Sequence, residues 1–429
     1  MHRVRAAATT EPGRLRAIGA VLAALIVLFG VVTAWEVSER EAAAEAVVEH
    51  SQPLSVDAAR IYRSLADADT TAASGFLAGG DEPRAVRERY EKDIRDASEL
   101  LAKAAANSDS SRSAQRQIAK LNRTLPVYTG LVESARANNR QGLPLGGAYL
   151  RYANEQMREE MLPAARVLYT AETARLGNDY EEAKRWPWFA LGAGALALGA
   201  LGWAQRRNYR RTNRVFNLGL VGATAASLAV MLWLTAGHGV ARWNLSESDE
   251  KGARSLQALN EAWIGALQAR GDENMTLVAR GAGSAYEEAF QKQMGDVAGR
   301  GTDRAGQGLL EDALFLADDA AGSKPVEEAQ RAVGIWKDRH KDARGEDDAG
   351  DYDAAVEGVI GAEGSTGECF DNVDASLSKA SAHEQEEFER AADDGRGGFA
   401  GLAVGAAVLA VLGAAAGVLG VGRRLSEYR

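Results

Sequence analysis

The sequence predicts an all-α membrane protein with four transmembrane helices and two extracytoplasmic helical-bundle domains, whose helices continue into the spans. Three observations predict this fold. Four apolar runs carry no charge and are long enough to cross a bilayer core of ~30 Å, which takes about 20 helical residues. Two long polar segments lie between them, with apolar residues spaced by three and four positions, as in packed helices. Strand-like alternation is almost absent from the 429 residues.

These runs and segments define the expected organisation. In chain order it comprises a cytoplasmic tail (1–16), transmembrane helix 1 (17–35), a four-helix bundle (36–185), transmembrane helix 2 (186–204), an Arg-rich cytoplasmic loop (205–214), transmembrane helix 3 (215–237), an acidic helical bundle (238–397), transmembrane helix 4 (398–422) and a cytoplasmic tail (423–429). The first run could instead be a cleaved signal peptide. Its apolar stretch exceeds the roughly 7–15 residues typical of such peptides, so we favour an uncleaved anchor.

The distribution of arginine predicts the orientation of the chain in the membrane. The loop between the second and third runs contains five arginines and no acid. They are Arg206, Arg207, Arg210, Arg211 and Arg214. Both tails are also basic, and short basic segments remain in the cytoplasm. We therefore expect a multi-pass cell-membrane protein with both termini inside and both bundles outside. Because the cytoplasmic share is small, we expect a separate polypeptide to read the signal, and the five arginines are candidates for docking it.

Charge excludes one class of partner. Residues 36–185 carry 21 basic and 24 acidic residues, and residues 238–397 carry 17 and 34. A nucleic-acid-binding domain needs clustered positive charge, so no nucleic-acid partner is expected. The single cysteine, Cys369, cannot form an intramolecular disulfide and is expected to be a partly buried free thiol.

A faint internal repeat relates the two halves. Residues 69–80 read DTTAASGFLAGG and residues 272–283 read DENMTLVARGAG. Each segment ends at a similar distance beyond the outer end of a span. Duplication and two copies of a generic helical hairpin both remain open.

Helix breakers divide the two polar segments. In the first they fall at 79–83, 107–111 and 138–147, which predicts four helices, with bends at Pro53 and Pro163 and the last helix running as one rod into the second span. Up-and-down threading then brings 79–83 and 138–147 together at the end far from the membrane. The second segment predicts four or five less regular helices.

The search for chemistry predicts no enzyme, no cofactor and no metal site. No two of the five histidines lie within one helical turn of each other, which leaves no helical pair for zinc. The histidines, all expected to be solvated, are His2, His50, His238, His340 and His383. Small residues of the last run, such as Gly405 and Gly413, allow close helix contact, either within the four spans or in a homodimer.

The far end of the first bundle is the candidate partner surface. Irregular loops displayed by a rigid bundle commonly bind partners. The candidate residues are Gly79, Gly80, Asp81, Glu82, Asn139, Arg140, Gln141, Leu143 and Leu145. The two leucines could instead cap the bundle core.

Two resemblances extend this prediction. Both outer segments resemble the four-helix-bundle sensory domains of bacterial chemoreceptors and histidine kinases. The segments 61–80 (IYRSLADADTTAASGFLAGG), 125–142 (LPVYTGLVESARANNRQG) and 148–165 (AYLRYANEQMREEMLPAA) resemble a family of actinobacterial four-span proteins encoded beside a glutamine-type substrate-binding lipoprotein and protein kinase G. The second half matches less distinctly.

The closer resemblance implies a non-enzymatic relay. The extracytoplasmic lipoprotein would bind an amino acid, this chain would sense it through the membrane, and a cytoplasmic Ser/Thr kinase would respond. A direct small-ligand sensor of chemoreceptor type and a structural cell-envelope protein are the alternatives.

Overall fold

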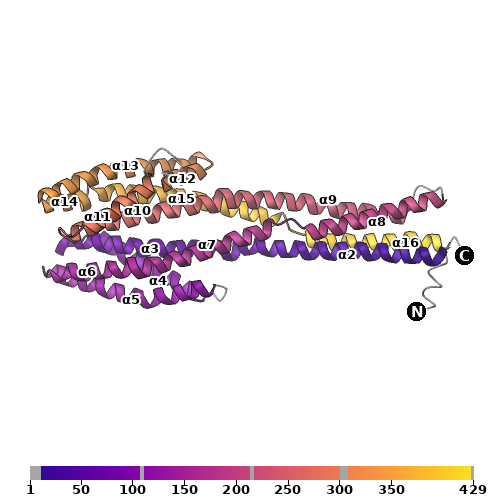
Figure 1. The fold of residues 1–429 in the computed structure, drawn as a ribbon, viewed down its shortest axis with the longest axis horizontal. Coiled ribbons are helices and arrows are strands. Elements are labelled where there is room, and N and C mark those ends of the chain that lie inside the picture. Colours follow the sequence, from indigo (N-terminus) through magenta and orange to yellow (C-terminus); the bar gives the residue numbers. More distant parts are fainter. Residues whose placement is uncertain (1–10, 107–110, 213–216, 300–307, 427–429) are drawn as a thin grey trace. The chain divides into compact units, whose positions relative to one another are not determined.

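The computed structural model describes residues 11–106, 111–212, 217–299 and 308–426 (Figure 1). All regular secondary structure in these ranges is helical, which confirms the all-α prediction. The chain divides into two compact units. One comprises Met1–Val48, Asn178–Glu247 and Ala391–Arg429 and is called the span unit; the other comprises Glu49–Gly177 and Ser248–Arg390 and is called the bundle unit.

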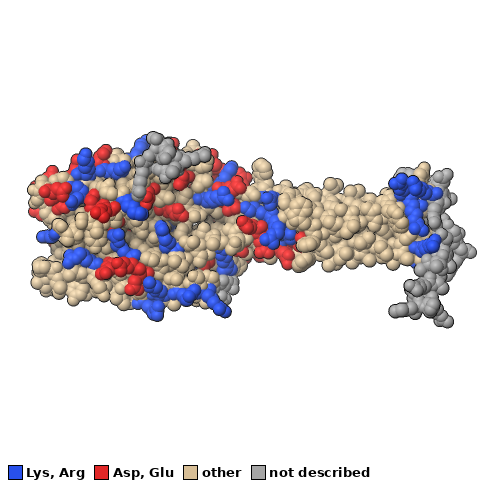
Figure 2. Space-filling model, viewed as in Figure 1, with Lys and Arg blue, Asp and Glu red and all other residues tan. Residues whose placement is uncertain are grey.

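The span unit contains the four apolar runs. They form helices α2 (Glu11–Ala46), α8 (Trp188–Thr212), α9 (Leu218–Glu247) and α16 (Leu402–Ser426). Each belongs to a helical stretch long and apolar enough to cross a membrane, as predicted. Figure 2 shows a broad band of this unit without Lys, Arg, Asp or Glu on the face in view. Exposed side chains such as Leu196, Leu232 and Val404 suit contact with lipid.

Small residues let the four helices approach closely. α16 packs against α2 and α9, and α8 packs against the same two helices. A Cβ added at Gly219 would lie 2.3 Å from the Cα of Gly420, so the backbones of α9 and α16 nearly touch there. A Cβ at Gly405 would lie 2.1 Å from the ring of Trp233. Gly405 therefore packs within the span unit, which is one of its two expected roles.

The second span does not continue the preceding helix. Three residues separate α7 (Leu162–Lys184) from α8, and Pro187 is the last of them. The single rod expected here is therefore interrupted. A proline lacks the N–H that a continuing helix needs and disfavours helical geometry in the residue before it.

Two charged side chains of α2 satisfy the broken helix ends. Arg40 Nε donates to the carbonyl oxygen of Arg185 at 2.7 Å, and its Nη2 donates to that of Trp186 at 3.2 Å. Glu36 Oε2 accepts from the backbone N–H of Ala190 at 2.7 Å, in the first turn of α8. Buried backbone groups left by a helix break are costly unless such partners are present.

In the bundle unit, the first segment forms the four predicted helical stretches. They are α3 (Gln52–Leu77), α4 (Arg84–Ala106), α5 (Arg112–Arg140) and a final stretch of α6 (Leu145–Gln156), η3 (Met157–Met161) and α7, with a short 3-10 turn η2 (Gly79–Asp81) after α3. The π-helical segment η1 (Val47–Ser51) precedes Pro53, and η3 precedes Pro163. A π turn accommodates the backbone where a proline removes a helical hydrogen bond.

The second segment is more divided than expected. After the π-helical segment η4 (Ser248–Ala253), its described residues form six helices rather than four or five. They are α10 (Arg254–Val278), α11 (Ser284–Ala298), α12 (Leu309–Leu316), α13 (Ala320–Ala349), α14 (Tyr352–Ile360) and α15 (Thr366–Gly397).

Both segments share one apolar core. It includes Ile61 and Leu65 of α3, Leu121 of α5, and Phe290 and Trp336 of the second segment. α3 and α10 lie side by side at its centre, where Thr70 Oγ1 donates to the carbonyl oxygen of Leu267 at 3.0 Å. The sequence predicted two bundles, and the packing combines both segments in a single compact unit.

Candidate ligand-binding site

A polar cavity of about 700 Å³ lies inside the bundle unit, and we call it the central cavity. Its wall is built by α3, α6, η3, α7 and α10–α12. Its polar lining includes Tyr62, Asp69, Asn154, Arg158, Gln268 and Asp272. Both segments of the chain therefore line the central cavity. α3 supplies Asp69, and α10 supplies Asp272.

Asp69 is a buried carboxylate held by neutral donors. Asp69 is only 7% exposed. Tyr128 Oη donates to its Oδ1 at 3.2 Å, and Asn154 Nδ2 donates to its Oδ2 at 2.6 Å. Burial raises the pKa of Asp69 to about 6, against the opposing effect of these two hydrogen bonds. The carboxylate therefore titrates near neutral pH.

Asp272 faces the same cavity and has one cationic partner. The residue is 5% exposed, and its Oδ1 accepts a hydrogen bond from Nη1 of Arg158. Burial raises the pKa of Asp272 to about 7, although the Arg158 guanidinium opposes this rise and Asp69 adds to it. Two carboxylates and one guanidinium thus occupy the inner wall.

The two aspartates stand at matching positions of the internal repeat. Asp69 begins the DTTAASGFLAGG segment and Asp272 begins the DENMTLVARGAG segment. The paired helices are fixed there by polar contacts: Asn274 Nδ2 donates to the carbonyl oxygen of Thr70 at 3.1 Å and to Ser74 Oγ at 2.7 Å. Two aspartates at corresponding positions of the two segments therefore line one cavity.

A second buried polar network is centred on Glu273 of α10. Glu273 is buried, and its Oε2 accepts from Arg270 Nη1 at 2.5 Å and from Thr366 Oγ1 at 3.0 Å. Its Oε1 lies 2.8 Å from Nδ1 of His340 and accepts from Trp336 Nε1 at 3.1 Å. Burial disfavours its ionised form, but Arg270 and His340 outweigh that effect and lower the pKa of Glu273.

His340 corrects the expectation that all histidines are solvated. Its ring is buried, stacks on Phe290 with 3.7 Å between centroids, and places Nε2 3.1 Å from Oε1 of Glu287. Burial alone would lower its pKa, but Glu273 and Glu287 raise it to about 9. His238 is also buried, whereas His50 is exposed and His2 lies outside the described residues.

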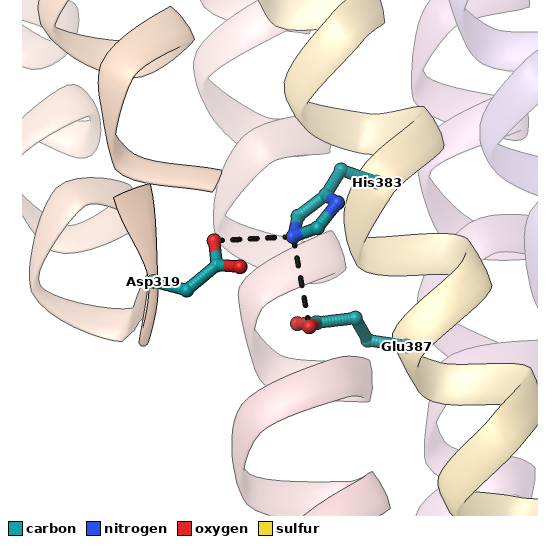
Figure 3. A group of neighbouring side chains, drawn as sticks. All are labelled: Asp319, His383 and Glu387. Atoms are coloured by element: carbon teal, nitrogen blue, oxygen red, sulfur yellow. Dashed lines mark hydrogen bonds and ion pairs between the residues drawn. The ribbon is translucent and has the colours of Figure 1, made fainter. Parts of the chain in front are cut away.

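The Asp319, His383 and Glu387 side chains form a small surface cluster (Figure 3). His383 Nε2 lies 3.1 Å from Asp319 Oδ1 and 3.6 Å from Glu387 Oε1. The same Asp319 oxygen accepts from the backbone N–H groups of Ala321 and Gly322 at the start of α13. This oxygen therefore caps the start of α13.

The predicted partner residues lie at two neighbouring turns, as expected. Asn139 Nδ2 donates to the carbonyl oxygen of Phe76 at 2.8 Å, which joins the α5–α6 turn to the end of α3. Glu82 is engaged internally, with its Oε1 2.9 Å from Arg136 Nη2. The remaining residues of the two turns, Gly79, Gly80, Asp81, Arg140 and Gln141, are half-buried or exposed.

Leu143 and Leu145 are 45% and 54% exposed, so they do not cap the core. Of the predicted docking arginines, Arg206 and Arg210 are exposed, and the Arg207 guanidinium lies 5.5 Å from the ring centroid of Trp203. The Arg211 side chain and Arg214 lie outside what the structure describes. Partner binding at either surface remains a prediction.

Sequence reasoning missed the buried charged residues. Asp69 lies beside the apolar stripe of α3 that contains Leu65, Ala68 and Ala72. An acid next to such a stripe, matched by Asp272 in the repeat, was the available signal. Glu273 and His340 gave none, because their burial depends on contacts between distant helices.

Residues 43–181 match a known family model. The family is described as an actinobacterial sensor domain. The match covers the first segment, including Asp69, Asn154 and Arg158, and less than half of the chain. Comparison with curated proteins and with solved structures yields no match. The family match and the four apolar helices support an actinobacterial membrane sensor.

Proposed function

We propose that this chain is a non-enzymatic membrane sensor that takes a small polar ligand directly into the central cavity. The observation that carries this proposal is the cavity, in which buried charged side chains from both segments converge. Ligand sites commonly have volumes of roughly 300–1,000 Å³ and a few convergent polar groups. The sensor-domain match over residues 43–181 supports the same function.

The test is thermal unfolding of the full chain in lipid nanodiscs with a panel of small polar metabolites. A compound that binds only the folded state raises the unfolding midpoint. We expect Asp69→Asn to reduce this rise, and Asp338→Asn, an exposed site on α13, to leave it unchanged. Compounds that never raise the midpoint, or raise it equally in wild type and Asp69→Asn, would contradict direct binding in the cavity.

The second candidate function is a relay between partners. Here an extracytoplasmic substrate-binding lipoprotein reports an amino acid, and a cytoplasmic Ser/Thr kinase receives the signal. The observation that favours it is the exposure of Leu143 and Leu145 beside Arg140, which offers apolar and charged contacts at one turn. The lipoprotein would bind there, and the kinase would dock on the arginines of residues 205–214.

Two variant sets test the relay. Arg140→Glu with Leu143→Ser should abolish capture of the lipoprotein from membranes without changing the melt. α8 continues to Thr212, so four of the five arginines expected in a loop lie on this helix and only Arg214 lies beyond it. Changing all five to lysine retains charge but removes the bidentate fork, and should weaken kinase capture. Wild-type capture by both variants would remove the reason for placing partners at these surfaces.

We further propose that the termini and residues 205–214 are cytoplasmic and that the bundle unit lies outside, because of the arginine distribution. Reporter fusions after Gln205, Arg211 and Arg424 should report a cytoplasmic position. Fusions within residues 81–84 or 347–350 should report an external one. An external signal after Arg211 would reverse the orientation.

A further inference from the structure

The inner wall of the central cavity has an excess of negative charge. Asp69 and Asp272 contribute two carboxylates, whereas Arg158 contributes one guanidinium. Asp69 accepts its hydrogen bonds from two neutral groups, the Tyr128 hydroxyl and the Asn154 amide. A buried charge without a counter-charge is costly, so a positive group placed here would be bound favourably.

The wall also contains an unpaired hydrogen-bond acceptor. Oδ1 of Asn154 is buried and accepts no hydrogen bond among the described residues, while its Nδ2 is used by Asp69. Tyr62 Oη already accepts from Gln268 Nε2 at 3.2 Å. An unpaired acceptor next to two carboxylates favours a ligand group rich in hydrogen-bond donors. A protonated amine supplies three donors and one positive charge.

The rim of the cavity differs from its inner wall. Arg166 and Lys292 are exposed, and Lys292 Nζ lies 3.0 Å from Asp296 Oδ2. Gln293 Nε2 donates to Gln268 Oε1 at 3.0 Å. Because this rim carries both signs of charge, it can contact the far end of a ligand whether that end is positive, negative or neutral. The selective part of the site is therefore the inner wall.

We infer that the central cavity binds a small organic ligand through a protonated amino group, which is received between Asp69 and Asp272 beside Oδ1 of Asn154. This inference rests on the proposed direct-sensor function and names its ligand class. Binding at the carboxylates competes with protons, because both aspartates titrate near neutral pH. The affinity for an amine therefore rises as the pH is raised from about 5 to about 8.

Four matched probes test the inference with the full chain in nanodiscs: 1,4-diaminobutane, 4-aminobutyrate, butyrate and butane-1,4-diol. Calorimetry and thermal unfolding should detect both amines and neither amine-free compound. Asp69→Asn and Asp272→Asn should each weaken amine binding about tenfold or more, which corresponds to ~1.4 kcal/mol. Asp338→Asn is the matched control and should bind as wild type.

The outcomes separate the two proposals. Butyrate or the diol binding as well as the amines, with the loss in Asp69→Asn retained, overturns the amine assignment and leaves direct sensing intact. Amine binding that is equal in wild type and both aspartate variants places the ligand elsewhere and overturns the assignment. Absence of binding by all four probes overturns the amine assignment, and absence across the metabolite panel as well overturns direct sensing.

Discussion

Oε1 of Glu273 and Nδ1 of His340 lie 2.8 Å apart, and both side chains are buried. The pair joins α10 to α13 inside the second segment. Arg270, Trp336 and Thr366 complete the hydrogen bonding of the carboxylate. Such a satisfied network is stable only while every member is present, because each one left alone is a buried unpaired group.

Glu273→Gln should destabilise the bundle unit strongly. The substitution leaves Arg270 and the protonated His340 without their shared anion, and removing one partner of a buried ion pair costs about 3–5 kcal/mol. Chemical unfolding of the full chain measures the loss. The control is Glu288→Gln, at an exposed position of α11, which should cost less than ~0.5 kcal/mol. Equal losses would contradict the buried network.

The same pair predicts a loss of stability at alkaline pH. The pKa of His340 is raised to about 9 in the folded protein, above its ordinary value. Its stabilising contribution is therefore fully present below about pH 6.5 and is lost as pH rises through about 9. Over this pH range, the melting temperature should fall more steeply for wild type than for His340→Gln. Parallel curves would show that the imidazole does not titrate in this range.

The central cavity predicts a loss of stability that begins at a lower pH. Asp69 and Asp272 have folded pKa values raised to about 6 and about 7. Because these values lie above the ordinary range, their contribution to stability is present below about pH 4 and is lost as pH rises through about 6 to 7. Asp69→Asn, which remains neutral, should therefore be more stable than wild type at about pH 8 without ligand. A less stable variant at that pH would contradict the unfavourable burial of this carboxylate.

The centre of the shared core predicts the largest apolar effects. Ile61 and Leu65 are fully buried on α3, and their replacement by alanine should each cost about 2–5 kcal/mol. Arg84→Ala is the control, because its exposed side chain only pairs with Glu88 one turn away. That change should cost less than ~0.5 kcal/mol. A small loss at Leu65 would indicate that the core can collapse around the missing side chain.

Local patterns predicted the helices better than their association. The apolar spacing through Ile61 and Leu65 predicted α3, and the glycines at 79–80 predicted its end. The union of both segments depends on contacts such as Thr70 to Leu267, between residues almost two hundred positions apart. Periodicity carries no information on such distant partners, so the central cavity could not be located.

The same limit applies to single charged residues. Asp69 and Asp272 were visible only as the first residues of a faint repeat. The burial of His340 depends on Glu273, Glu287 and Phe290, which belong to other helices. Helix breaks are easier to predict from the sequence, because a proline such as Pro187 marks the end of α7. The long apolar run after Pro187 nevertheless favoured one continuous helix.

Four connections join the helices of the two polar segments to the four apolar spans. These connections are of two kinds. α2 and α9 pass into α3 and α10 through π-helical turns, so backbone hydrogen bonding is maintained. α7 and α15 are separated from α8 and α16 by non-helical residues, at 185–187 and 398–401. A π turn preserves backbone hydrogen bonding within the helix, whereas the residues of a gap lie outside any helix. Each half of the chain is therefore joined to its apolar spans by one continuously helical connection and one interrupted connection.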